Sequence, residues 1–229
     1  MNMKPYTKKI VLENGQEFYG YGFGADKEAI CEIVFNTSMV GYQEIMSDPS
    51  YTDQMVVMTY PLIGNYGMTD EDYETKNPTI GGMIVREYND SPSNFRYTKT
   101  LSEVFEEHAI PGIEGVDTRA LTKMLRSQGS MNAMLTCAQQ FDVGQVLERL
   151  HAYKVRDTIQ KVTRSAPEEF PAIGEERYHV AMMDYGVKQN MIDCLRRRGC
   201  SVTALPASTP AETVLSGGYD GVLLSSNSW

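Results

Sequence analysis

The sequence predicts an α/β protein: an N-terminal domain of mixed strands and helices, followed by the first part of a doubly wound parallel sheet. In the first part, short apolar runs bounded by turn residues alternate with segments of helical periodicity. From residue 178 the order is strand, helix, strand, helix, strand, which is typical of a parallel sheet with crossover helices. We therefore expect an N-terminal domain over residues 1–152, a linker over 153–177 and an incomplete second domain over 178–229.

The elements are expected from turn signals and periodicity. Asn14-Gly15 is a strong hairpin signal between two short strands, and residues 29–36 read as another strand. Further strands are expected over 54–60 and 79–86, and helices over 42–46, over 101–108, from a cap at Asp117 or Thr118 to Gly129, and from 143 onward. The second part is expected as strand 178–183, helix 187–198, strand 202–205, helix 211–215 and strand 221–224.

The composition is close to that of an ordinary soluble protein, with 229 residues, 41% hydrophobic and 22% charged. The net charge of -9 argues against a surface for nucleic acid or an anionic membrane. The sequence has no apolar run long enough for a membrane span and no signal-peptide pattern at its N-terminus. The cysteines show neither CxxC nor metal-ligand spacing, so we expect reduced thiols in a cytosolic protein.

Three glycines, Gly20, Gly22 and Gly24, raise the question of a phosphate-binding loop. That fingerprint requires a helix to begin after the glycines, because the helix N-terminus holds the phosphate. Here the residues that follow, 29–36, read as a strand. We therefore expect no dinucleotide site.

The candidate functional segment is Phe35–Tyr51, FNTSMVGYQEIMSDPSY. Pro49 biases Asp48 away from the helical region, so the preceding helix should end there. Ser50 is then left on a rigid turn with its hydroxyl free, and loops fixed in this way often carry function.

Several long motifs resemble one family. They are FNTSMVGYQEIMSDPSY, TYPLIGNYG, SNFR at Ser93–Arg96, GVDTRALTKMLR and DYGVKQNMIDCLRRRGC. In this order, and over nearly the whole chain from Val11 to Ser225, the sequence is similar to the small, glutamine-hydrolysing subunit of carbamoyl-phosphate synthetase.

The resemblance implies a small-subunit-specific α/β domain that packs on a large subunit, followed by a class I glutamine amidotransferase domain. In the family a cysteine attacks the glutamine amide, and ammonia passes to the large subunit, which makes carbamoyl phosphate for pyrimidines and arginine. We expect no cofactor in this chain, with ATP and magnesium on the large subunit, and a cytoplasmic location. The family's Asp-Pro-Ser-Tyr serine contacts glutamine, which here assigns glutamine binding to Ser50; the alternative is that Ser50 only caps its turn.

The sequence departs from the family after Ser225, where Ser226–Trp229 stand in place of a glycine-rich loop. The family's nucleophilic cysteine and its His and Glu partners follow further on, and these residues act as a unit. We therefore expect a C-terminally truncated small subunit with no catalytic residue and no glutaminase activity alone.

Eight other residues are candidates to replace the missing site. They are Cys31, Cys137, Cys194, Cys200, His108, His151, His179 and Asp184. None of them has a suitable base or metal spacing, and Asp184 ends a parallel strand where it either binds a ligand or caps the next helix. The alternative function is a non-catalytic binding or regulatory module that docks through its N-terminal domain. A bare edge of the incomplete sheet also suggests self-association.

Overall fold

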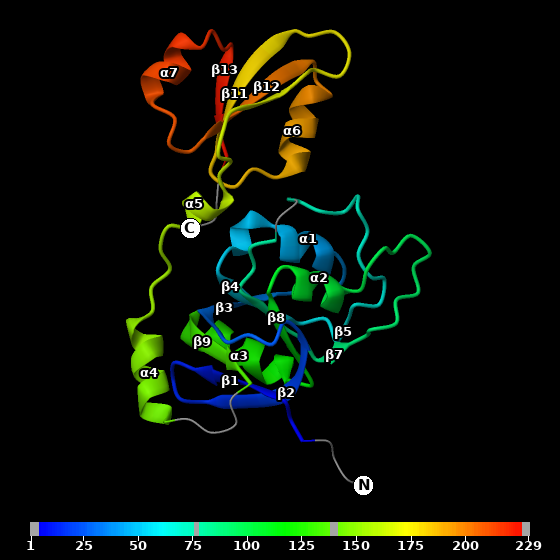
Figure 1. The fold of residues 1–229 in the computed structure, drawn as a ribbon, viewed down its shortest axis with the longest axis vertical. Helices are drawn as coiled ribbons and strands as arrows, with labels where there is room; N and C mark the ends of the chain where they lie inside the picture. Colours follow the sequence, from blue (N-terminus) through cyan, green and yellow to red (C-terminus); the bar gives the residue numbers. More distant parts are fainter. Residues whose placement is uncertain (1–4, 76–77, 138–141, 226–229) are drawn as a thin grey trace. The chain divides into compact units, whose positions relative to one another are not determined.

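The structure, a computed structural model, describes residues 5–75, 78–137 and 142–225 (Figure 1). The chain divides into two compact units. Unit 1 comprises Met1–Ser47, Asp53–Tyr73 and Ile80–Arg156, and unit 2 comprises Asp48–Thr52, Glu74–Thr79 and Asp157–Trp229. Both units combine strands and helices, so the predicted α/β fold class is confirmed.

The strands of unit 1 close into a barrel in the order β1-β2-β8-β6-β4-β3-β9. They are β1 Lys8–Leu12, β2 Glu17–Gly24, β3 Ala29–Asn36, β4 Gln54–Met58, β6 Gly82–Ile84, β8 Pro111–Glu114 and β9 Met131–Thr136. β1 and β2 form the predicted hairpin, with Val11 opposite Glu17 on either side of the turn. Closure of the barrel was not predicted, because it depends on β1 pairing with the distant β9, where Lys9 lies opposite Thr136. Two short strands outside the barrel, β5 Leu62–Ile63 and β7 Glu87–Tyr88, pair in parallel.

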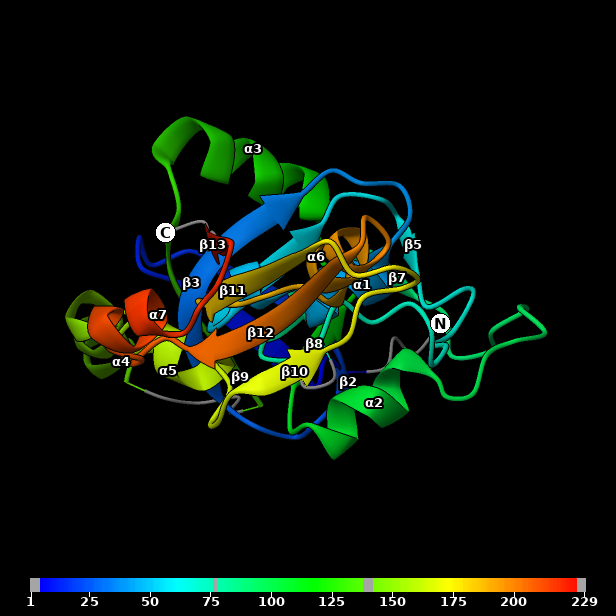
Figure 2. The same cartoon turned by 90° about the horizontal axis from the view of Figure 1, so that it is seen from above.

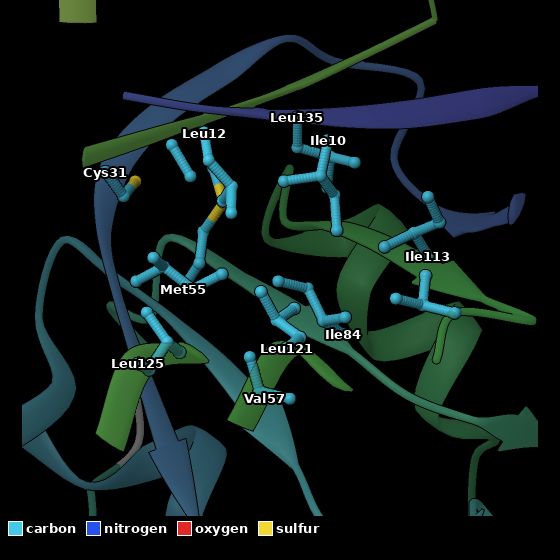
Figure 3. Close-up of a cluster of buried hydrophobic side chains, with 13 residues drawn as sticks. Ile10, Leu12, Cys31, Met55, Val57, Ile84, Ile113, Leu121, Leu125 and Leu135 are labelled. Atoms are coloured by element: carbon cyan, nitrogen blue, oxygen red, sulfur yellow. The ribbon is translucent and has the colours of Figure 1, made fainter. Parts of the chain in front are cut away.

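Alternation along β1 separates the two packing faces of the barrel. Ile10 and Leu12 point into the main core, where α3 (Thr118–Gln128) adds Leu121 and Leu125 (Figure 3). Val11, between them in sequence, belongs to a second cluster that includes residues of α4 (Val143–Ala152). α3 therefore contributes to the core of the barrel, while α4 covers the opposite face of β1 and β9.

The helices of unit 1 begin at side-chain caps. Thr100 caps α2 (Leu101–Glu107) and forms a capping box with Glu103. At α3 the cap is Asp117, which accepts a hydrogen bond from the backbone N–H of Ala120, and Gly129 ends the helix with a φ of 91°. α1 (Tyr42–Ser47) ends one residue before Asp48, as the following proline predicts.

The glycines of β2 serve close packing of strands. A Cβ added at Gly20 would lie 2.1 Å from the carbonyl oxygen of Glu114 on β8, and one at Gly22 would lie 2.6 Å from Cε of the buried Lys8. The strand continues through Gly24, and β3 follows without an intervening helix. Between Gly24 and β3, where every residue is described, no helix begins, although the phosphate-binding fingerprint requires one at that point of the sequence.

Unit 2 is built on a sheet of order β10-β12-β11-β13. Its central strands are β11 (Tyr178–Asp184), β12 (Cys200–Pro206) and β13 (Gly221–Leu224), and β12 and β13 both run parallel to β11. α6 (Gln189–Arg196) packs Ile192 against the face that carries Met182. α7 (Ala211–Ser216) packs Val214 against the opposite face, which carries Met183. The predicted strand and helix order is confirmed.

The segment predicted as an irregular linker contains regular structure. It carries α5 (Thr158–Val162) and β10 (Glu168–Phe170), and β10 pairs antiparallel with the outer edge of β12. A three-residue edge strand in a segment with two prolines and mixed charge has no recognisable pattern in the sequence. It forms because β12 offers it an edge to pair with. Among the described residues, no helix has the length and apolar character needed to cross a membrane.

Candidate functional site

The candidate site is the turn Asp48–Thr52, which is held rigidly from within. After α1, Pro49 begins a short 3-10 helix, η1 (Pro49–Tyr51), and Asp48 caps it by accepting a 2.9 Å hydrogen bond from the backbone N–H of Ser50. The hydroxyl of the fully buried Thr52 donates to the carbonyl oxygen of Pro49 at 2.7 Å. Because backbone and side chains are both fixed, the position of Ser50 is strongly constrained.

The second carboxylate oxygen of Asp48 joins this turn to α6. It accepts a 2.6 Å hydrogen bond from Nζ of Lys188, the residue at the N-cap position of α6. The ion pair is largely shielded from water, since the side chains of Asp48 and Lys188 are 14% and 35% exposed. Asp48 therefore couples the Ser50 turn to the helix that follows the first strand of the parallel sheet.

Ser50 itself is half-buried and uses its backbone N–H in the turn. Its hydroxyl makes no hydrogen bond with any other residue that the structure describes. The carboxylate of Asp48, rather than this hydroxyl, supplies the cap. The assignment of glutamine binding to Ser50 stays a prediction.

Asp184, at the carboxyl end of β11, is a structural anchor. Its Oδ1 accepts hydrogen bonds from the backbone N–H groups of Gly186 and Val187, so it stabilises the turn before α6. Its Oδ2 accepts two further hydrogen bonds from Arg164, from the backbone N–H and from Nε. The predicted cap on the next helix is wrong, because α6 begins after Lys188 without a side-chain cap; Asp184 holds the preceding turn instead, and its pairing with Arg164 was not foreseen.

The four cysteines are all among the described residues, and they are free thiols. Cys31 belongs to the barrel core and Cys200 is buried in β12. The thiol of Cys194 lies 3.7 Å from Oδ1 of Asn190, one turn earlier in α6. Burial raises the pKa of the Cys137 thiol and nearby Asp26 raises it further, so the reactive thiolate is disfavoured. None of these positions resembles an activated nucleophile.

The histidines also have structural positions. Nε2 of His179 lies 2.8 Å from the Thr203 hydroxyl, and its ring packs edge-on against Tyr219. His108 follows the last residue of α2, and His151 lies in the last turn of α4. No cluster of His, Cys, Asp and Glu suited to a metal ion occurs among the residues that the structure describes. The predicted departure from the glycine-rich loop, Ser226–Trp229, lies outside the described residues.

The fold and the turn define an α/β protein in which a Ser-bearing loop is fixed against a parallel-sheet unit. The family described as carbamoyl-phosphate synthase small chain, CPSase domain, matches residues 10–135. The chain belongs to this family, which confirms the predicted resemblance.

Curated relatives extend the similarity beyond the matched domain. The pyrimidine-specific small chain of carbamoyl phosphate synthase from Halalkalibacterium halodurans is 45% identical over 95% of this chain and 59% of its own length. The small chain from Fusobacterium nucleatum is 47% identical over 96% of this chain and 60% of its own length. The chain thus spans about three fifths of the length of these relatives. A solved aminopeptidase from Aneurinibacillus, with a TM-score of 0.33 and 9% identity over 96% of this chain and 56% of its own, is too dissimilar to inform the fold.

Proposed function

We propose that the chain belongs to the small-subunit side of carbamoyl phosphate synthase, an enzyme whose small subunit hydrolyses glutamine and supplies ammonia to a large subunit. There ammonia combines with bicarbonate and ATP-derived phosphate to give carbamoyl phosphate, for pyrimidine and arginine synthesis. Family membership supports this role. The single structural observation behind it is the Asp48–Lys188 ion pair, which places the Ser50 turn in the compact unit of the parallel sheet.

Ser50 is proposed to contact glutamine. A hydroxyl donates and accepts hydrogen bonds, so it suits both the ammonium and the carboxylate of an amino acid. Ser50 is half-buried, and its hydroxyl has no hydrogen-bond partner among the described residues. Asp48, rather than Ser50, caps the short helix η1. Saturation-transfer NMR with glutamine should give a signal with the native chain that Ser50→Ala weakens strongly. Equal signals for the two proteins would remove Ser50 from the binding site.

The family's domain plan is proposed to apply to this chain. Residues 1–152 would form the small-subunit-specific domain, 153–177 the connection and 178–229 amidotransferase-like structure. The partner is the synthase large subunit, which would bind ATP and magnesium, and the location is cytoplasmic. The small-chain names of the relatives support a large-chain partner.

The 229-residue chain is proposed not to hydrolyse glutamine by itself. Two of its cysteines are buried, a third lies beside an asparagine, and the exposed Cys137 has a raised pKa. Ammonia release from glutamine should stay at background for the chain alone and with an added synthase large chain. Release above background that is abolished by Cys137→Ser or Cys194→Ser would contradict this and identify the nucleophile.

The alternative is a non-catalytic docking or regulatory module. The test is the rate at which a synthase large chain makes carbamoyl phosphate from ammonia instead of glutamine, measured with and without this chain. A change in that ammonia-dependent rate, without glutamine hydrolysis, would favour the module. An unchanged rate would leave the small-subunit role as the better account.

A further inference from the structure

One contact at the Ser50 turn comes from a distant part of the chain. The hydroxyl oxygen of Thr52, at the end of the turn, lies 2.6 Å from the hydroxyl oxygen of Thr79, which is 27 residues further on. A hydroxyl carries one proton, and Thr52 uses its proton in the hydrogen bond to the carbonyl oxygen of Pro49. Thr79 is therefore the donor between the two hydroxyls. Two hydrogen bonds in series thus run from Thr79 through Thr52 to the first residue of η1.

The segment that carries Thr79 is anchored by its backbone. The strand that follows Thr79, β6, pairs in parallel with β4, the strand that follows the turn. Earlier in the same segment, the carbonyl oxygen of Glu74 accepts a 3.0 Å hydrogen bond from the backbone N–H of Gln189, the first residue of α6. α6 is itself packed on the parallel sheet of unit 2 (Figure 2). The Thr79 hydroxyl is therefore a fixed point against which the turn can be held.

Both ends of η1 are held by side chains from elsewhere in the sequence. Asp48 holds the start of η1 through the backbone N–H of Ser50, and Lys188 is the partner of Asp48. Thr52 holds the end of η1 through the carbonyl oxygen that begins it, and Thr79 is the partner of Thr52. All five residues belong to unit 2. The two contacts together determine where the Ser50 hydroxyl lies.

We propose that Thr79 is a positioning residue for Ser50, because its hydroxyl determines the distance between the turn and the neighbouring segment. This inference rests on the proposed function, which supplies glutamine as the ligand of Ser50. The sequence predicts Thr79 only as the first residue of a buried strand, so it contains no signal for this role.

The effect of losing the Thr79 hydroxyl follows from the short contact. Thr52 is fully buried, so no bulk water replaces the lost donor. A methyl group in place of the hydroxyl also introduces a steric conflict, because carbon approaches oxygen no closer than about 3.3 Å and the two oxygens are 2.6 Å apart. Thr79→Val should therefore displace the turn by roughly 0.7 Å, and Ser50 with it.

The test is the affinity of the 229-residue chain for glutamine, measured by titration in saturation-transfer NMR. We expect Thr79→Val to weaken the affinity at least about fivefold, which corresponds to the loss of one hydrogen bond between the ligand and the displaced Ser50 hydroxyl. Thr79→Ser keeps the hydroxyl and should bind within about twofold of the native chain. If Thr79→Val does not fold, Thr79→Ala removes the hydroxyl without the steric conflict and should weaken the affinity in the same direction.

The matched control is Thr203→Val on β12. Thr203 is 5% exposed and belongs to the same unit, and its hydroxyl oxygen lies 2.8 Å from Nε2 of His179. The change thus removes a buried hydroxyl contact of the same kind at a residue outside the turn. A general loss of stability in unit 2 would weaken glutamine binding by Thr203→Val as well, whereas a positioning effect is specific to Thr79. Circular dichroism of each variant confirms that it remains folded.

The outcomes separate this inference from the proposed function. If the native chain does not bind glutamine, the proposed contact of Ser50 is wrong and the positioning inference falls with it. If Ser50→Ala weakens binding but Thr79→Val binds within about twofold of the native chain, Thr79 does not position Ser50 and the proposed role of Ser50 stands. If Thr79→Ser or Thr203→Val is weakened as much as Thr79→Val, the effect is not specific to the hydroxyl at position 79 and the inference is overturned.

Discussion

The Asp48–Lys188 ion pair should hold the Ser50 turn with a coupling energy that can be measured. Asp48→Ala removes two interactions, the cap on the Ser50 N–H and the contact with the Lys188 ammonium. A capping side chain contributes about 1 kcal/mol. The ion pair should lie between an exposed pair, at roughly 0.2–1 kcal/mol, and a fully buried pair whose disruption costs about 3–5 kcal/mol. With one partner mostly buried and the other one-third exposed, we take about 1.5 kcal/mol for the pair.

Asp48→Ala should therefore lower the opening free energy of the turn by about 2.5 kcal/mol. Lys188→Met should lower it by about 1.5 kcal/mol, because the cap remains. The double variant should show a coupling energy of about 1.5 kcal/mol. Native-state hydrogen exchange of the Ser50 amide is the suitable assay, because two compact units need not unfold together.

The matched control for the loss of a lysine charge is Lys154→Met, an exposed position that should change the opening free energy by less than about 0.5 kcal/mol. A coupling energy below about 0.5 kcal/mol between Asp48 and Lys188 would mean that the two residues act independently. The ion pair would then have no part in positioning Ser50.

Other contacts give further predictions. Leu121→Ala should destabilise unit 1 by about 2–5 kcal/mol in urea unfolding, because it opens a cavity in the barrel core, and a loss below about 1 kcal/mol would contradict the packing of α3. Arg164→Met should destabilise unit 2 by about 3 kcal/mol, because it leaves the buried Asp184 carboxylate without its cation. An unchanged thermal unfolding temperature would show that Arg164 does not anchor Asp184. Hydrogen bonds from Thr100 lower the pKa of Glu103, so its contribution to stability is present at neutral pH and lost as the pH falls through the folded-state pKa. The pH dependence of the urea midpoint in acid should therefore be shallower for Glu103→Gln, and identical profiles would show that the capping box does not couple to protonation.

Local signals were sufficient to predict most individual elements. The Asn14-Gly15 hairpin, the helix ended by Gly129 and the end of α1 before Pro49 all depend on residues close in sequence, which determine turn and cap geometry. The order of strands and helices beyond residue 178 was predictable for the same reason, because periodicity is itself a local property.

The candidate site was only partly predictable. The Asp-Pro-Ser turn and its rigidity could be read from the sequence, but the pairing of Asp48 with Lys188 could not. A lysine just before a helix has many possible acidic partners, and only the folded chain selects one. The pairing of Arg164 with Asp184 was equally unpredictable, because Arg164 lies in a segment that the sequence predicts to be a linker.

The sequence by itself thus determined the fold class, the family and the local geometry of the Ser50 turn. Tertiary structure alone decided that β1 closes a barrel with β9, that β10 completes an edge of the second sheet and that α6 holds the turn through Lys188. The physical reason is that turns and caps are interactions between near neighbours in the chain. Strand closure and buried charge pairs join residues far apart in sequence, and their partners are selected by packing of the whole unit.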